Sequence, residues 1–210
     1  IEPKRKKYKN KEGPIKEIIK IIKYSLHHHG EVKWLIFYSG FIGASTLTMT
    51  WLIQPYLKLV GLPLAYFGIV WGIFNISVGI FSLYAYKIEM KFGKKKSLVS
   101  LIFIAVIGYI LMGLFQSLLG ILFIFLFYFV RGVSNPIFKD YVNRVISSDI
   151  RATVLSVKNL VVRFIFAIVG PFIGVLTDIY SLSFALLSSG GIFIICGTIS
   201  LFFLHKNKGL

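Results

Sequence analysis

Apolar side chains fall in long runs along most of this chain, separated by short polar segments. Six runs are long enough to cross a bilayer, because about 20 helical residues rising 1.5 Å each span a hydrocarbon core of roughly 30 Å. The pattern therefore predicts an all-α polytopic membrane protein, with a domain of six transmembrane helices over residues 34–205. The runs lie at 34–56, 64–86, 98–115, 118–138, 153–177 and 182–204.

Basic residues alternate between the segments that connect these runs. Ten Lys or Arg precede the first run, five fall in 86–97, three in 139–151 and two after the last run. The other three connections carry one, none and none. Because Lys and Arg accumulate in cytoplasmic loops, both termini of this segment are predicted on the cytoplasmic side of a multi-pass protein of the cell (plasma) membrane.

The first 33 residues form a separate basic segment, 1–33, and residues 206–210 form a cytoplasmic tail. From Ile15 onward, apolar residues at helical spacing lie opposite lysines, which predicts an amphipathic helix on the surface of the lipid bilayer. It is either a connector or a lipid-sensing helix. Since the chain opens on this basic linker and not on a Met, we expect it to be part of a longer protein.

Composition and charge exclude several classes of protein. With 56% hydrophobic residues and a mean hydropathy of +0.79, the chain is too apolar for a soluble domain. The net charge of +16 gathers at the ends of segments, so we expect no nucleic-acid partner. The lone Cys196 excludes an intrachain disulfide, and the consecutive residues 27–29, all His, point to different sides of a helix. No enzyme motif, cofactor or metal site is expected.

Two arginines inside apolar runs are the strongest candidates for function. Arg131 is about 20 Å from the outer end of its run and Arg163 about 15 Å from the inner end of the next. A charge inside the bilayer costs from about 2.5 to more than 10 kcal/mol, so it normally faces a partner or water. Three partners remain open: an anionic substrate, a carboxylate elsewhere in the protein, or backbone carbonyls freed by Pro136 and Pro171.

Polar residues at steps of three and four extend these candidates along the helices. One stripe of the fifth run carries Asn159 and Arg163, whereas Lys158 is expected to extend its amine toward the inner surface. Glycines of the second run are expected to pack against a neighbouring helix, and the third run is expected to face lipid. The predicted lining of a substrate cavity is Arg163, Asn159, Arg131, Asn135, Thr50, Gln54 and Asn75.

The chemistry that is missing narrows the function further. No acidic residue lies in the middle of a predicted helix, so this chain offers no proton carrier of the usual kind. Neither a filter loop nor a ring of charge indicates a channel. A transporter remains as the preferred function.

Several motifs resemble those of one transporter family. The segment KIEMKFGKKKSL (87–98) is similar to the loop between helices of the major facilitator superfamily, with Gly93 at the turn and Lys94 to 96 as the basic run. Met90 stands where the pattern usually has Asp, and Glu89 precedes it. Further similar segments are QPYLKLVGLP (54–63), RATVLS (151–156) and, as in the drug-antiporter branch, GPFIG (170–174).

The resemblance implies that the chain is the C-terminal six-helix half of a twelve-helix transporter. Its partner would be the N-terminal six-helix half of the same polypeptide, and its substrate a small molecule, drug-like or another organic solute, with an anion as one option. The first and fourth runs would line the central cavity. The cytoplasmic gating loops implied by the resemblance comprise Glu89, Gly93, Lys94, Lys95, Asp140 and Arg151.

Two rival functions remain open on the sequence. A six-helix membrane scaffold would recruit partners through its basic tail and transport nothing. A six-helix module could also work as a homodimer, with the polar stripe of the fifth run at its interface.

Overall fold

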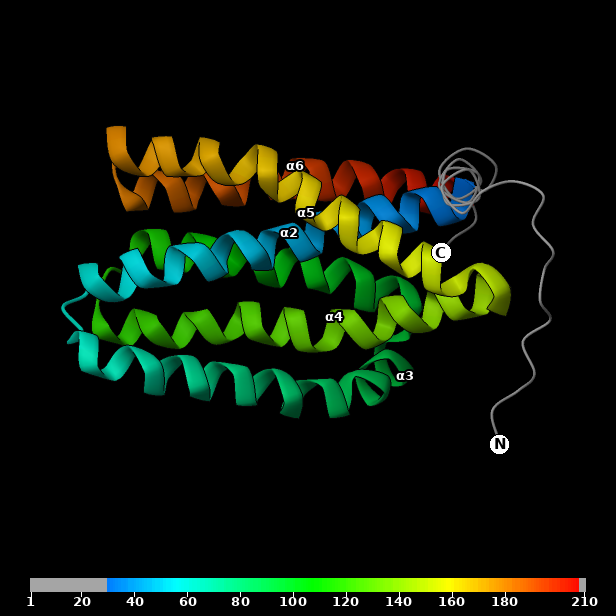
Figure 1. Ribbon diagram of the computed structural model, residues 1–210, viewed down its shortest axis with the longest axis horizontal. Coiled ribbons are helices and arrows are strands. Elements are labelled where there is room, and N and C mark those ends of the chain that lie inside the picture. Colours follow the sequence, from blue (N-terminus) through cyan, green and yellow to red (C-terminus); the bar gives the residue numbers. More distant parts are fainter. Residues whose placement is uncertain (1–29, 208–210) are drawn as a thin grey trace, which may run out of the picture.

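The structure, a computed structural model, describes residues 30–207, the side chain of Asp149 excepted, and is helical throughout this range apart from short turns (Figure 1). The predicted basic linker and amphipathic helix lie almost entirely outside the described residues. The helices are α2 (Gly30–Leu59), η2 (Leu64–Tyr66), α3 (Phe67–Leu114), η3 (Leu118–Phe123), α4 (Ile124–Val145), α5 (Ser148–Ile179) and α6 (Leu182–Lys206).

Five helical segments in the described range are long and apolar enough to cross a membrane. They confirm a helical, multi-pass membrane protein. The prediction of six separate spans is confirmed only in part, because the runs 64–86 and 98–115 belong to one segment. The five candidate spans are Gly30–Leu59, Leu64–Leu114, Leu118–Val145, Ile150–Ile179 and Leu182–Lys206.

The charged segment between those two runs is helical on both sides of Gly93, where the sequence pattern predicted a loop, and two helices meet at that glycine. Lys, Glu and Met are good helix formers, so charge alone does not end a helix. Only Gly93 departs from helical geometry, with φ 76° and ψ 162°. Residues that carry a side chain rarely adopt that backbone conformation, which explains the glycine at this position.

Around Gly93 the chain reverses its direction. Lys94 Nζ lies 3.8 Å from a carboxylate oxygen of Glu31, at the start of α2. At the far end of α2, the Tyr56 hydroxyl donates to the carbonyl of Phe115 at 2.6 Å. Residues 94–114, the second arm of α3, therefore run alongside α2 from its start to its end, and residues 67–92, the first arm, run the opposite way (Figure 1). The two ends of the bundle are called the Gly93 end and the Gly61 end below.

The second arm carries much of the core. Tyr109 is fully buried, donates to the carbonyl of Ser45 at 2.6 Å, and packs edge-on against Phe127 at a centroid distance of 4.7 Å. Only one side of this arm, with Phe103 and Ile107, is exposed. The prediction that the third run simply faces lipid is therefore wrong for its other side, which α2, α4 and α6 cover.

The first arm packs on α4, but not through its glycines. A Cβ added at Gly68, Gly72 or Gly79 would meet nothing within 4 Å. The close approach comes from Gly132 of α4, where an added Cβ would lie 2.8 Å from the carbonyl oxygen of Val78. Within the described residues no helix packs on these glycines, so the neighbour predicted for the second run is not among α2 to α6.

The helices α4 and α5 extend beyond the runs predicted for them. The expected loop 139–151 shrinks to Ile146 and Ser147, because α4 ends at Val145 and α5 begins at Ser148. Asp140 and Arg144 stand one turn apart with their charged groups 2.7 Å apart, a pairing that favours continued helix.

Candidate functional site

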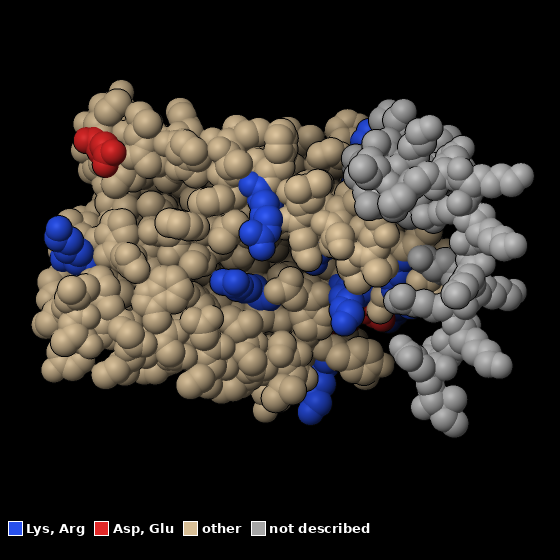
Figure 2. Space-filling model, viewed as in Figure 1, with Lys and Arg blue, Asp and Glu red and all other residues tan. Residues whose placement is uncertain are grey.

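A cavity of about 330 Å³ lies half-way along α2, α4 and α5. Figure 2 shows blue side chains in the middle of an otherwise tan face, and the surface is hollowed between them. Its lining combines small, amide and cationic side chains from the three helices. The residues are Ser39, Gly43, Thr46, Leu47, Arg131, Ser134, Asn135, Phe138, Lys158, Asn159, Val162 and Arg163.

The α2 wall is formed by a row of small residues. The hydroxyls of Ser39 and Thr46 donate to carbonyls one turn earlier on their own helix, at 2.9 and 3.0 Å. A Cβ added at Gly43 would lie 2.7 Å from a methyl group of Val162 on α5. Small residues therefore bring α2 and α5 close together, as in other membrane helix pairs, and the cavity opens beside that contact.

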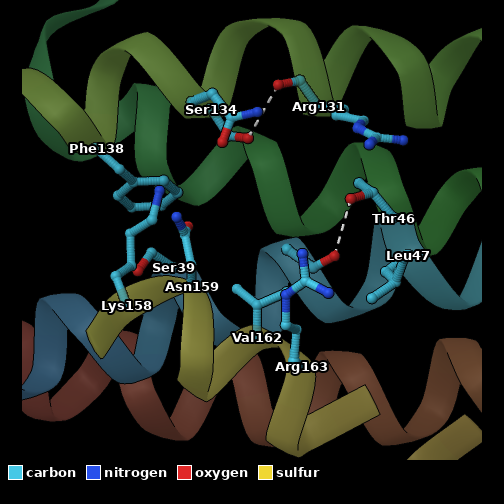
Figure 3. A pocket seen from close by; sticks show the side chains of 12 residues that line it. Ser39, Thr46, Leu47, Arg131, Ser134, Phe138, Lys158, Asn159, Val162 and Arg163 are labelled. Atoms are coloured by element: carbon cyan, nitrogen blue, oxygen red, sulfur yellow. Dashed lines mark hydrogen bonds between the residues drawn. The ribbon is translucent and has the colours of Figure 1, made fainter. Parts of the chain in front are cut away.

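The α4 wall carries Arg131, Ser134, Asn135 and Phe138, which follow helical steps of three and four. The helix also contains Pro136, which has no N–H to donate to the carbonyl four residues earlier, that of Gly132. Figure 3 shows Arg131 on the opposite side of the cavity from Arg163. The structure records no hydrogen bond from either guanidinium to a carbonyl within residues 30–207.

The α5 wall holds Lys158, Asn159, Val162 and Arg163. Lys158 is only 8% exposed, and Figure 3 shows its chain extending toward Phe138 inside the cavity. The expectation that it extends toward the membrane surface is wrong. Its helix row explains why, because Val154 and Ile165 on the same row are also buried against the bundle.

The three cations of the cavity have no acidic partner in the part of the chain that the structure describes. The salt bridges found there, Lys94 with Glu31 and Arg144 with Asp140, lie near the Gly93 end. No Asp or Glu is among the residues that line the cavity. The cavity therefore carries a local excess of positive charge inside a largely apolar bundle.

Four of the seven predicted cavity residues meet at this site, namely Arg131, Asn135, Asn159 and Arg163. The other three lie elsewhere. Thr50 donates to the carbonyl of Thr46 at 2.8 Å, and Asn75 is exposed and donates to the carbonyl of Trp71 at 2.8 Å.

The last predicted cavity residue, Gln54, lines a second hollow near the Gly61 end. This hollow has a volume of about 640 Å³ and a mainly apolar wall. Its lining residues are Gln54, Pro55, Lys58, Leu62, Leu64 and Phe67.

At the Gly93 end, Lys94 contacts more than one helix. Besides Glu31, its Nζ lies 4.6 Å from the ring centroid of Tyr141 on α4, within cation–π range. Lys95 is exposed and Glu89 is half-buried. This lysine thus connects the break in α3 to the start of α2 and to the end of α4.

The two predicted gating residues of the α4–α5 region have separate partners. Asp140 pairs with Arg144 on its own helix. Arg151 donates from one Nη to the carbonyls of Asn143 and Ile146, at 2.8 and 3.2 Å. Arg151 therefore holds the turn between α4 and α5 through backbone carbonyls.

Sequence reasoning missed Lys158 and Phe138 as cavity residues. Lys158 precedes the predicted stripe by one position, and its burial becomes visible only when its row with Val154 and Ile165 is considered. Within residues 30–207 no cluster of three His, Cys, Asp or Glu side chains offers a metal site.

Comparison with known proteins gives no further guide, since no protein-family model, curated protein or solved structure matches this chain.

Proposed function

We propose that this chain is the C-terminal six-helix half of a secondary transporter that moves a small organic solute by alternating access. The observation that carries the proposal is the cavity between α2, α4 and α5, with Arg131, Lys158 and Arg163 on its walls. Charged side chains half-way along apolar helices are costly unless they face a solute, an aqueous path or a partner. Transporters place their binding sites at this depth.

In this function the two arms of α3 are separate crossings, which gives six spans with both termini of the chain on the cytoplasmic side of the plasma membrane. The alternating charge of the connections supports this orientation. The motifs at 87–98, 151–156 and 170–174 support a relationship to the major facilitator superfamily. A second six-helix unit, the N-terminal half, would then close the open face of the cavity.

Alternating access can be tested without knowledge of the substrate. Val162 lines the cavity without carrying charge, so Val162→Cys is introduced into the full-length protein after Cys196 and any other cysteine are replaced by serine. A membrane-impermeant maleimide is then applied to right-side-out and inside-out vesicles. We expect labelling from both sides, because the rocking mechanism opens the cavity to each side in turn.

The matched control is Ile168→Cys, on the same helix but exposed outside the cavity lining. We expect no labelling of this variant from either side, because lipid covers the position. Labelling of Val162→Cys from one side only, or from neither, would contradict alternating access. It would favour a scaffold that transports nothing and recruits partners through its basic tail.

A further inference from the structure

The charge of the cavity restricts what it can bind. Three cationic side chains line it, no acidic side chain does, and the remaining polar groups are hydroxyls and amides. A neutral or cationic solute would leave this positive charge uncompensated in a medium where charge is poorly screened. An anion reduces the imbalance, and more so the more negative charge it carries.

Because Lys158 adds a third positive charge to the cavity, a bound molecule needs more negative charge to neutralise it. It is more than nine-tenths buried, lines the cavity, and has no acidic partner within residues 30–207. A single carboxylate on the occupant can pair closely with one or two of the cations. The third cation then stays uncompensated, so one negative charge does not satisfy the site.

The kinds of donor indicate how the charge is recognised. Arg131 and Arg163 carry planar forks that bind a carboxylate or phosphate group through two parallel hydrogen bonds. They extend from opposite walls of the cavity (Figure 3), so each can hold a different end of the same molecule. Asn135 and Asn159 supply amides for hydroxyl or carbonyl groups between those ends.

We infer that the cavity binds a small organic dianion, a molecule with two carboxylates or with a phosphate monoester, and that Lys158 sets the preference for two negative charges over one. This inference rests on the proposed transport function and names its substrate class. A carboxylate from the second half of the transporter is the rival source of negative charge, and the binding experiment separates the two.

The test measures binding to the purified full-length protein by isothermal titration calorimetry with four probes. Succinate carries two carboxylates, glycerol 3-phosphate a phosphate monoester, lactate one carboxylate, and glycerol no charge. We expect succinate or glycerol 3-phosphate to bind at least tenfold more tightly than lactate, and glycerol not to bind. Tighter binding of succinate indicates a site for dicarboxylates, and tighter binding of glycerol 3-phosphate indicates a site for phosphate monoesters.

The variants Lys158→Met and Lys158→Arg test whether Lys158 sets the preference for two negative charges over one. Methionine fills similar space without charge, so we expect the preference for the dianion over lactate to fall by about tenfold or more, while arginine retains it. Lys91→Gln, which removes an exposed lysine far from the cavity lining, is the control and should bind as the parent does. Because Lys158→Met removes a buried charge, the unliganded variant should fold at least as well as the parent.

Three results would overturn the inference. They are binding of lactate as tightly as both succinate and glycerol 3-phosphate, preferred binding of glycerol, and an unchanged preference in Lys158→Met. Equal binding would also indicate that a carboxylate of the second half already neutralises the cations. The labelling of Val162→Cys separates the proposed transport function from the inferred substrate class. If Val162→Cys is labelled from both sides but any of these three results is found, the substrate class is wrong and the transport function stands.

Discussion

The contact of Arg151 with the end of α4 gives a prediction whose size follows from the structure. The helix ends at Val145, so the carbonyl of Asn143 has no donor one turn later within its own helix. Arg151 supplies that donor at 2.8 Å and also reaches the carbonyl of Ile146 at 3.2 Å. A hydrogen bond from a charged group contributes about 1.5–3 kcal/mol, and the second bond here is the longer and shares the same nitrogen. We therefore assign the pair about 2–3 kcal/mol.

The perturbation is Arg151→Gln, which removes the charge and whose shorter side chain cannot reach both carbonyls. A loss of about 2–3 kcal/mol corresponds to a melting temperature lower by roughly 5–10 °C, on the scale for chains of about 200 residues. Thermal unfolding of the purified protein in detergent measures that change. Hydrogen exchange followed by mass spectrometry should show faster exchange in residues 139–151, because the turn loses its donor.

Arg144→Gln is the matched control for this prediction. Arg144 is exposed and pairs at 2.7 Å with Asp140 on the same helix, and an exposed pair of this kind adds little stability because water competes for both charges. We expect its melting temperature to stay close to that of the parent. If Arg144→Gln destabilises the protein as much as Arg151→Gln does, the assignment of stability to the carbonyl contacts is wrong.

Three further outcomes are expected. Tyr109→Phe should lower the free energy of unfolding by about 1 kcal/mol in thermal unfolding, because it removes the donor to the Ser45 carbonyl, whereas the exposed Tyr180→Phe should have little effect. Gly132→Ala should cost about 1–3 kcal/mol, since its methyl would press on the backbone of α3, whereas Gly191→Ala meets open space; equal effects of the two would contradict the close α3–α4 contact. Arg163→Gln should abolish uptake of the preferred dianion into proteoliposomes at normal expression, and unchanged uptake would remove Arg163 from the site.

The sequence was informative where a local pattern determines the structure. Long apolar runs predict helices that cross a membrane, and steps of three and four predict which side chains share a helix face. That reasoning, together with the cost of a charge inside the bilayer, selected Arg131, Asn135, Asn159 and Arg163, which the structure brings into one cavity.

The side chains whose surroundings were predicted wrongly share a physical cause. The sequence of a helix shows which residues lie on one face, but not which helix packs against that face. Asn75 and Gln54 stand on polar faces as the cavity residues do, yet Asn75 is exposed and Gln54 lies toward the Gly61 end. Lys158 is buried because α5 packs its row on the bundle, and nothing within the α5 sequence alone fixes that contact. The charged segment before Gly93 stays helical because its residues are good helix formers, so its charge did not predict a loop in the backbone correctly.

At Gly93 the sequence and the structure agree, because a turn glycine was expected there and the structure gives it φ 76° and ψ 162°. An added Cβ would meet nothing within 4 Å, so any cost of Gly93→Ala comes from the backbone and not from a clash. Holding alanine in that region costs about 1–3 kcal/mol. We expect Gly93→Ala to melt at a lower temperature than the parent, in contrast to Gly191→Ala, whose site is equally open but helical. If both alanine variants melt like the parent, the reversal does not depend on the conformation of Gly93, and the two arms of α3 are not held apart by this residue.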